Sequence, residues 1–335
     1  MPDVPQRMHA AYVERLGGVE NICYGRVPVP RLGPTEVLVT VEAVTVNPVD
    51  TFVRSGAFPT RTPFPFVIGR DLAGTVAALG PGAAGFSVGE RVWCNSLGHG
   101  GRQGSFAQYA AVPVDRLYRI PDGVEAVQAV ALAHPAATAW LGLFRHARLP
   151  LGGTVFVGGG AGNVGDAAIH LATATGARVI ASATGEGLDR CRVAGATVVV
   201  DYRDPDAIEH IRAAAPDGLD VHWDTSGHHD FGAAVGLMAR GGRILLTAAG
   251  PQARVELPIG ATYTNDVSVL GFVISNATST ELAAAARVIN QRLVDRTLTA
   301  RIAGNLPLAD AAGAHRRVEQ GQISGARLIL HPPRP

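Results

Sequence analysis

The sequence predicts an α/β protein in which a doubly wound parallel sheet follows a β-rich first part. Short β-like runs separated by Gly and Pro turns fill the first 120 of the 335 residues. From about residue 125, short apolar runs alternate with helical stretches, and a glycine-rich turn joins the first of these runs to its helix in VFVGGGAGNVGDAAIH, residues 155–170. This length fits two domains, each able to bury a core of its own.

The first part is predicted to be an antiparallel or barrel-like β domain. Its β-like runs are HAAYVE at 9–14, followed by 36–46, 72–79, 90–94 and 105–113. Turns such as LGPTE and LGPGAAGF separate them, and short strands divided in this way are typical of all-β domains.

The second part alternates strands with helices. An Ala-rich helix at 125–147 leads into it. Strands are expected at 154–157, 178–182, 197–200, 219–224 and 242–247, and helices at 164–175, 186–194, 206–214 and 229–239. Such alternation implies a parallel sheet with helices on both faces, which is the doubly wound architecture of nucleotide-binding domains.

The chain end is predicted to return to the first domain. A late apolar strand, VSVLGFVI at 267–274, completes the alternating pattern, and the later helix at 280–293 and strand ARLIL at 326–330 have no place in it. The predicted domain boundaries are therefore 1–127 and 273–335 for the β-rich domain and 128–272 for the inserted one.

The glycine-rich turn predicts a dinucleotide site. Gly160, Gly162 and Gly165 form G-x-G-x-x-G, and Gly159 begins an overlapping G-x-x-G-x-x-G. Either motif alone also occurs in turns that bind nothing. Here the motif follows a strand and opens a helix, where glycine allows a pyrophosphate to approach backbone N–H groups at the positive end of the helix dipole.

The end of the second strand favours NADPH over NADH. An acidic residue there would bind the ribose 2′-hydroxyl and repel a 2′-phosphate. The chain has neutral Ser182 and Thr184 instead, and its first acid, Glu186, falls in the next helix. Candidates for binding a 2′-phosphate, set against plain solvated residues, are Arg190, Arg192 and Tyr202.

Composition argues against several other classes. Net charge is +1 and no basic run exceeds two residues, which is unlike a nucleic-acid or anionic-membrane surface. No apolar stretch reaches the roughly 20 residues of a membrane span, and no signal or transit pattern precedes the first domain, so a soluble cytoplasmic protein is expected. Three separated cysteines indicate reduced thiols. All 29 basic residues are arginine, which excludes lysine chemistry.

These motifs carry a family resemblance over essentially the whole chain. The segments VTVNPVDTFVRSG (44–56), GRDLAGTVAALGPGAAGFSVGERV (69–92), GGGAGNVG, GARVIASA and ARLIL resemble, in order and spacing, the medium-chain dehydrogenase/reductase superfamily, and within it the zinc-free NADPH:quinone oxidoreductase (ζ-crystallin-like) branch. The resemblance implies a Rossmann domain inserted into a β-rich GroES-like catalytic domain made from both chain ends, with NADPH in the cleft. It also implies a homodimer in which the late edge strand pairs with its twin.

Zinc members of that superfamily hold a catalytic metal through Cys, His and Cys. The positions matching these ligands by motif are Asn47, Arg70 and His134. An amide and a guanidinium cannot replace thiolate or imidazole ligands, and Cys94 alone remains near the place of a four-cysteine structural site. We therefore expect no metal, and hydride transfer to a small-molecule acceptor that needs no Lewis acid.

The resemblance also assigns candidate catalytic residues. Asn47 corresponds to a cleft asparagine facing the nicotinamide end of the cofactor, or else caps a turn. Asp50 is a candidate catalytic group or the N-cap of a short helix at 50–54. His134 is a candidate acid or substrate contact, or a structural histidine in an apolar run. Phe52 and Phe58 stand where related enoyl reductases carry a tyrosine proton donor, and are expected to form an apolar pocket wall.

Further positions along the cofactor's path are implied in the same way. They are individually weak, but together they follow the carboxyl ends of the parallel strands, where doubly wound sheets bind ligands. These positions include the residues already named, which are Gly159, Gly160, Gly162, Gly165, Ser182, Thr184 and Tyr202. The additional positions are Thr138, Asn163, Val164, Ser226, Ala249, Phe272 and Ile274.

Three functional hypotheses follow. The leading one is an NADPH-dependent reductase that transfers hydride directly to a quinone or another conjugated carbonyl. The second is a reductase of enoyl thioesters or other activated alkenes in a biosynthetic pathway. The third is a protein that binds NADPH without catalysis.

Overall fold

The computed structural model describes residues 4–250 and 252–334, which form two units. Unit 1 comprises Met1–His134 and Thr278–Pro335, and unit 2 comprises Pro135–Ala277. The chain thus leaves unit 1, builds unit 2, and returns. This arrangement confirms the predicted α/β class with a parallel-sheet domain inserted into a β-rich one.

Unit 2 contains a six-stranded, wholly parallel sheet in the order β11-β10-β9-β12-β13-β14. Its strands are β9 (Thr154–Gly158), β10 (Arg178–Ala183), β11 (Val198–Asp201), β12 (Leu219–Asp224), β13 (Met238–Leu246) and β14 (Ser268–Gly271). The order reverses at β9, which is the 3-2-1-4-5-6 pattern of dinucleotide-binding sheets. Ligands of such sheets bind at the carboxyl ends of the strands, beside this reversal.

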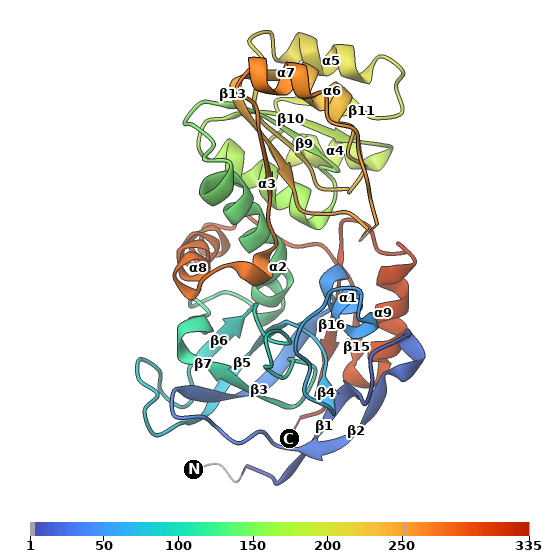
Figure 1. Cartoon of the computed structure of the whole chain (residues 1–335). Coiled ribbons are helices and arrows are strands. Elements are labelled where there is room, and N and C mark those ends of the chain that lie inside the picture. The colour runs from blue at the N-terminus through green and yellow to red at the C-terminus, as the bar shows by residue number, and fades with distance from the viewer. Residues whose placement is uncertain (1–3, 251, 335) are drawn as a thin grey trace. The chain divides into compact units, whose positions relative to one another are not determined.

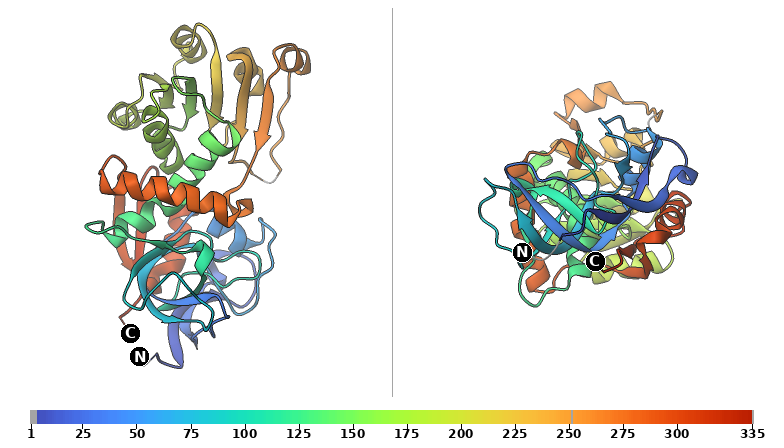
Figure 2. Two further views of the ribbon diagram at one scale, coloured as in Figure 1. Left: turned by 90° about the vertical axis from the view of Figure 1, so that its left-hand side faces the viewer. Right: turned by 90° about the horizontal axis from the view of Figure 1, so that it is seen from below.

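Helices lie on both sides of this sheet, as the edge-on view in Figure 2 (left) shows. Figure 1 labels them, with α3 and α4 near β9 and β10. They are α3 (Asn163–Thr173), α4 (Glu186–Val193), α5 (Ala207–Ala214), α6 (Phe231–Gly236) and α7 (Ile259–Thr264). The four expected helices are present, and α7 was not predicted.

Two predicted elements of unit 2 have the wrong length. The helix expected at 229–239 is only α6, because the Asp230 side chain caps its start by accepting from the Ala233 N–H, and β13 already begins at Met238. The strand expected at 267–274 is only β14, and a 3₁₀ turn at Ile274–Asn276 follows.

The Ala-rich segment forms one long, mainly apolar helix. It comprises α2 (Ala126–Trp140) and a π-helical continuation, Leu141–His146. By length and composition its 21 residues could cross a membrane, contrary to the expectation that no such stretch exists, but most of the helix is buried inside the protein. Burial of this kind is typical of the core helix of a globular protein.

Unit 1 contains a seven-stranded sheet in the order β15-β16-β3-β5-β6-β8, with β7 also paired to β3, and a small sheet in the order β2-β1-β4. All pairs are antiparallel except β15 with β16. The strands are β1 (Arg7–Val13), β2 (Cys23–Pro28), β3 (Glu36–Thr45), β4 (Phe66–Val67), β5 (Asp71–Leu79), β6 (Arg91–Cys94), β7 (Tyr109–Pro113), β8 (Tyr118–Arg119), β15 (Ile302–Pro307) and β16 (Arg327–His331).

The two ends of the chain build unit 1 together. In β16, Ile329 pairs with Thr45 of β3, so the predicted return of ARLIL to the first domain is confirmed. The return segment also holds α8 (Ser279–Val294) and α9 (Ala311–Glu319). Asn290 of α8 accepts a hydrogen bond from the Trp93 indole N–H of β6 at 3.0 Å. These contacts join the first and last parts of the chain within unit 1.

Candidate cofactor and active site

The glycine turn between β9 and α3 has no room for side chains at two positions. Gly159 has a φ of +67°, a left-handed conformation that favours glycine. A Cβ on Gly165 would lie 2.3 Å from the Gly159 carbonyl oxygen, and one on Gly160 would lie 2.9 Å from the Cys191 sulfur. These glycines therefore let the turn pack tightly between α3 and α4.

Gly162, unlike Gly159, has a backbone conformation that any residue can adopt. It is the N-cap of α3, with an ordinary φ of −78°, and a Cβ there would meet only the Gly159 carbonyl oxygen, at 3.1 Å. The first amides of α3, which include Asn163 and Val164, lie at the positive end of the helix dipole. These amides are of the kind that bind a pyrophosphate in dinucleotide-binding domains.

Three of the predicted ribose-end residues lie together at the carboxyl ends of β10 and β11. Ser182 is buried, and its carbonyl accepts from the Gly160 N–H at 2.9 Å, which ties β10 to the glycine turn. Thr184 directly follows β10. Tyr202 directly follows β11, is 56% exposed, and donates its backbone N–H to the Ala183 carbonyl. The described geometry is therefore compatible with a neutral ribose pocket bordered by a phenol.

Of the two predicted phosphate-binding cations, the structure leaves Arg190 the more available. Arg192 pairs with Asp189 of the same helix at 2.5 Å. Arg190 makes no ion pair with any residue that the structure describes, and its Nε has no hydrogen-bond partner there. Helix α4 also packs close to the site, since a Cβ on its Gly187 would meet Ala161 of the turn at 2.9 Å and Ala183 of β10 at 3.1 Å.

The loop after β12 is fastened to the glycine turn. Thr225 donates its hydroxyl and its backbone N–H to the Gly158 carbonyl, at 2.8 and 3.0 Å. Ser226, the predicted cofactor residue, is exposed, and both its hydroxyl and its N–H donate to the Asp224 carboxylate at 2.6 Å. Thr225 and Asp224 were not predicted, although the hydroxyl-rich DTSG sequence directly after a strand is a signal for them.

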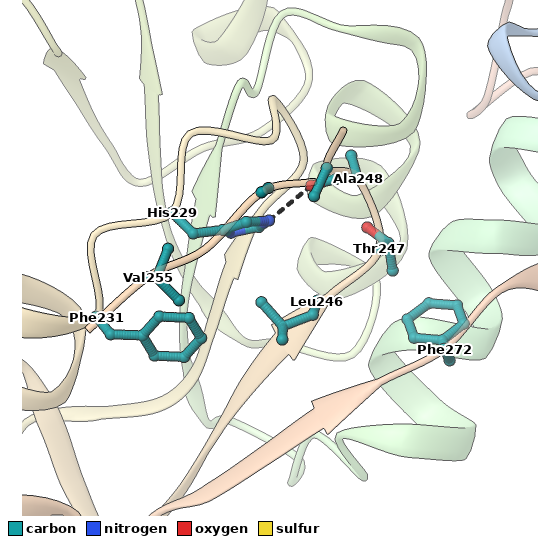
Figure 3. A pocket seen from close by; sticks show the side chains of 9 residues that line it. His229, Phe231, Leu246, Thr247, Ala248, Val255 and Phe272 are labelled. Atoms are coloured by element: carbon teal, nitrogen blue, oxygen red, sulfur yellow. Dashed lines mark hydrogen bonds between the residues drawn. The ribbon is translucent and has the colours of Figure 1, made fainter. Parts of the chain in front are cut away.

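A pocket of about 270 Å³ lies at the carboxyl ends of β13 and β14. Figure 3 shows Phe231, Leu246, Val255 and Phe272 around it, with His229 pointing toward Ala248. The His229 Nε2 donates to the Ala248 carbonyl at 2.6 Å, so its Nδ1 is left as an acceptor. The lining is Phe231, His229, Leu246, Thr247, Ala248, Ala249, Ala253, Val255 and Phe272. It includes two predicted cofactor positions, and its walls are mainly apolar.

The other predicted cofactor residues of unit 2 are less open. Thr138 of α2 and Ile274 of the 3₁₀ turn are both buried. Phe272 is half-buried, and its ring stacks on His146 with a centroid distance of 4.4 Å. The structure therefore gives no support to a direct cofactor contact by the side chains of Thr138 and Ile274.

Unit 1 contains a buried polar network centred on Asn47, which is 1% exposed. Its amide nitrogen donates to Asp71 at 2.8 Å and lies 3.4 Å from Asp50, and its amide oxygen accepts from Arg327 at 2.7 Å. Arg327 also lies 3.8 Å from the Asp71 carboxylate. Both ends of the Asn47 amide are thus engaged, so this residue positions the network rather than offering a free donor.

Asp50 is not the N-cap of a helix at 50–54, as one hypothesis held. Helix α1 spans Pro48–Ser55, and Asn47 is its N-cap. Asp50 is the third helical residue, and its carboxylate accepts from the Asn47 backbone N–H at 2.7 Å. Proline suits the first helical position, where its missing N–H costs nothing, so the helix begins earlier than predicted.

Burial, and after it the charge of Asp71, raises the pKa of Asp50 to about 7. The carboxyl therefore exchanges protons near neutral pH, where it can hold or release one inside the network. This property is useful to a general acid, and it also links protein stability to pH.

The raised pKa of Asp50 makes the stability of the folded protein decrease with rising pH. The unfolded chain ionises near 3.8, whereas the folded chain retains the proton up to about 7, so the stability of the protein falls as pH rises through this window. Asp50→Asn should remove that part of the slope, at most about 1.4 kcal/mol per pH unit, and become increasingly stabilising relative to wild type between pH 4 and 7. Urea unfolding at several pH values measures this, with the surface variant Asp217→Asn as control. A stability difference independent of pH would contradict it.

His134, at the end of unit 1, is buried, and its Nδ1 lies 3.6 Å from an oxygen of Asp71. Burial lowers the pKa of His134, although Asp71 opposes the shift. The imidazole is therefore neutral at physiological pH, which favours a hydrogen-bonding role over that of an imidazolium acid.

The two predicted pocket-wall phenylalanines differ in exposure. Phe52 on α1 is 43% exposed. Phe58 packs against the unit 1 core, and its ring lies 6.0 Å from that of His99. Neither can donate a proton, which leaves their contribution to a substrate apolar.

The donor set of this cluster does not suit zinc. Arg70, at a predicted ligand position, is a buried cation, and the Asn47 amide is fully engaged. Within residues 4–250 and 252–334, no three His, Cys, Asp or Glu side chains lie together so as to hold a metal ion. We therefore derive no step through a metal.

Comparison with known proteins identifies the family. Residues 33–122 match the alcohol dehydrogenase GroES-like domain, and residues 163–291 match the domain described as zinc-binding dehydrogenase. The quinone oxidoreductase of Mus musculus is 30% identical over 96% of this chain and 97% of its own length, and that of Homo sapiens is 29% identical over the same shares. The chain belongs to the medium-chain dehydrogenase/reductase superfamily, in its quinone oxidoreductase branch.

Solved structures agree with this assignment. A mycobacterial protein in complex with NADPH has a TM-score of 0.84 and is 31% identical over 97% of this chain and 100% of its own. An NAD-dependent alcohol dehydrogenase has a TM-score of 0.86 and is 30% identical over 97% and 99%. These relatives support a nicotinamide cofactor and an oxidoreductase activity for this chain.

Sequence reasoning missed part of the polar network. Asp71 and Arg327 were not predicted, although they lie within two quoted motifs, GRDLAG and ARLIL respectively. Their partnership could not be read from the sequence, because Asn47 and Arg327 are 280 positions apart.

Proposed function

We propose that this enzyme transfers hydride from NADPH directly to a quinone or another conjugated carbonyl, without zinc. The observation that supports the proposal is the chemistry of two of the positions that match the ligands of the zinc enzymes by motif: Asn47, whose buried amide is engaged by Asp71 and Arg327, and Arg70, a buried guanidinium. Electron-poor acceptors need no Lewis acid, and the proton that completes the reaction comes late. The names of the relatives support quinones as acceptors.

The reaction is tested with an acceptor panel. Purified protein, treated with chelator, should oxidise NADPH with 1,4-naphthoquinone and with conjugated enones, and should leave isolated alkenes and simple alcohols unchanged. Binding of NADPH without oxidation by any acceptor would favour a non-catalytic role. Reduction of enoyl thioesters alone would favour the activated-alkene hypothesis.

Preference for NADPH over NADH is proposed to depend on Arg190. The arginine is unpaired in the part of the chain that the structure describes and extends from the helix that packs against the turn, and no acid ends β10. Arg190→Gln should weaken NADPH binding about tenfold and leave NADH binding nearly unchanged, as loss of one charge-assisted contact does. Arg192→Gln is the matched control, because that arginine pairs with Asp189. Equal effects of Arg190→Gln on the two cofactors, measured by fluorescence titration, would exclude the assignment.

We also propose a homodimer that joins the two sheets through β14. This strand is at one edge of the unit 2 sheet, and its unpaired edge would be covered by a second copy. Light scattering should give twice the chain mass of 34.7 kDa. A monomer at micromolar concentration would contradict this.

A further inference from the structure

Arg70 is a buried cation of unit 1 whose Nε and Nη2 have no hydrogen-bond acceptor on the described part of the chain. Its side chain is 2% exposed. Two other buried arginines provide a comparison. Arg54 donates to the Gly17 carbonyl and to Glu319, and Arg327 donates to Asn47. Arg70 makes no such bond.

A buried guanidinium whose N–H groups lack acceptors destabilises the folded protein unless a ligand accepts hydrogen bonds from them. A buried donor without an acceptor costs about 1–3 kcal/mol, and more when the group is charged. Burial lowers the pKa of Arg70, whereas the charges of Asp50 and Asp71 favour the cation. These carboxylates balance its charge from a distance without accepting its hydrogen bonds.

The buried Nε and Nη2 of Arg70 donate to none of the charged or titratable groups around it on the described part of the chain. Arg102 is a further cation, and its guanidinium donates to the Ser96 carbonyl at 3.1 Å. Burial, together with the charges of Arg70, Arg102 and Arg116, lowers the pKa of His99 to about 4, so this imidazole is neutral. His134 is neutral as well. The N–H groups of Arg70 that lack an acceptor are therefore suited to an incoming oxygen.

We propose that Arg70 binds the carbonyl oxygen of the acceptor and stabilises the negative charge that develops on it. This inference rests on the proposed function and deepens it. The acceptor gains a hydride, which breaks a C–H bond of the reduced nicotinamide and forms a new bond to the acceptor. The electron pair displaced on the acceptor moves to its carbonyl oxygen, and a proton from water then neutralises the oxyanion.

The chemistry of guanidinium fits this task better than that of its neighbours. Its planar N–H groups can donate two parallel hydrogen bonds to one oxyanion or carboxylate, and it stays protonated at working pH. The Asn47 amide hydrogens are already used, and Phe52 and Phe58 have none to give. In a water-poor site such a preorganised cation acts where the zinc enzymes use a metal.

The kinetic test compares Arg70→Gln and Arg70→Lys with the charge-matched control Arg287→Gln, at an exposed position of α8. Arg70→Gln should lower kcat/KM for 1,4-naphthoquinone at least about 30-fold, since loss of one oxyanion donor costs about 10² or more. NADPH affinity should stay within about twofold, and Arg70→Lys should retain an intermediate rate. Arg287→Gln should keep nearly full activity. Unchanged kcat/KM in Arg70→Gln, or equal losses in both Gln variants, would overturn the proposal.

Chemical rescue separates direct contact from a structural role. Millimolar guanidinium chloride should restore part of the rate of Arg70→Ala, whereas sodium chloride at the same ionic strength should not. Rescue by both salts, or by neither in a variant whose melting temperature and NADPH affinity match wild type, counts against a direct contact.

A binding test keeps the inference independent of turnover. Benzoate imitates the developing oxyanion, and by calorimetry it should bind the wild-type NADP⁺ complex at least about tenfold more tightly than it binds the Arg70→Gln complex. Equal affinity would overturn the role of Arg70 even if the enzyme reduces quinones. Failure of wild type to reduce any acceptor, with benzoate still bound through Arg70, would instead overturn the proposed function alone. If Arg70→Gln does not fold, Arg70→Lys gives the same comparison.

Discussion

Gly162→Val is expected to weaken dinucleotide binding by more than about tenfold while the protein remains folded. The backbone at 162 has an ordinary extended conformation, and a Cβ there meets only the Gly159 carbonyl oxygen, at 3.1 Å. Loss of a favourable N-cap residue costs about 1 kcal/mol at most. The added side chain nevertheless occupies the approach to the N-terminus of α3, where a pyrophosphate would bind.

The control for this variant is Gly236→Ala, because a Cβ on Gly236 of α6 meets no atom within 4 Å. Both variants are compared with wild type by thermal unfolding and by NADPH titration. Gly165→Ala serves as the opposite case, since its Cβ would lie 2.3 Å from a backbone oxygen and should destabilise the domain itself. Wild-type affinity in a folded Gly162→Val protein would contradict the placement of the cofactor.

Arg327→Met is expected to destabilise the protein by about 3–5 kcal/mol, because it breaks a buried charge network and leaves one side uncompensated. Arg327 donates to the Asn47 amide oxygen at 2.7 Å and lies 3.8 Å from Asp71. Methionine keeps much of the volume but removes the donors. The loss should appear as a lower urea midpoint, and activity should fall with it because Asn47 loses an anchor.

Arg287→Met, on the exposed face of α8, is the matched control and should change stability by less than about 0.5 kcal/mol. If Arg327→Met were as stable as this control, the network would not hold the two ends of unit 1 together.

The local sequence pattern was sufficient to predict most strands and helices of unit 2. Each strand from β9 to β12 lies within about one residue of its predicted range, because fully buried parallel strands appear as short apolar runs between glycines and acids. The errors come from cases in which a single side chain or neighbouring strand decides the boundary. Asp230 fixes the start of α6, and β13 takes over residues that have helical composition.

The sequence did not predict the hydrogen-bond partners in the site, because these partners are far apart along the chain. The pattern around Asn47 indicated a functional residue, but its partners come from β5 and β16. Hydrogen bonds between such distant positions leave no local periodicity. Arg70 was considered only as an unsuitable zinc ligand, and its role as a cation became apparent from its burial and its missing acceptors.

The two units supply different parts of the proposed chemistry. Unit 2 offers the glycine turn, the loop after β12 and the apolar pocket of Figure 3, which suit a dinucleotide and a flat ring. Unit 1 contains the Asn47 network and the Asp50 carboxyl, whose raised pKa lets it hold a proton near neutral pH. It also contains the guanidinium of Arg70, whose Nε and Nη2 have no acceptor on the described part of the chain. The proposed reaction relies on orientation and fixed charge rather than on Lewis acidity for its rate enhancement.

Direct hydride transfer without a metal is tested most directly with NADPH deuterated at C4 and a conjugated enone, using protein stripped of metals by exhaustive chelation. The account predicts deuterium on the β-carbon of the product, a primary isotope effect on kcat/KM, and a rate equal to that of untreated protein. Loss of turnover on removal of stoichiometric Zn²⁺, with recovery when it is returned, would contradict it.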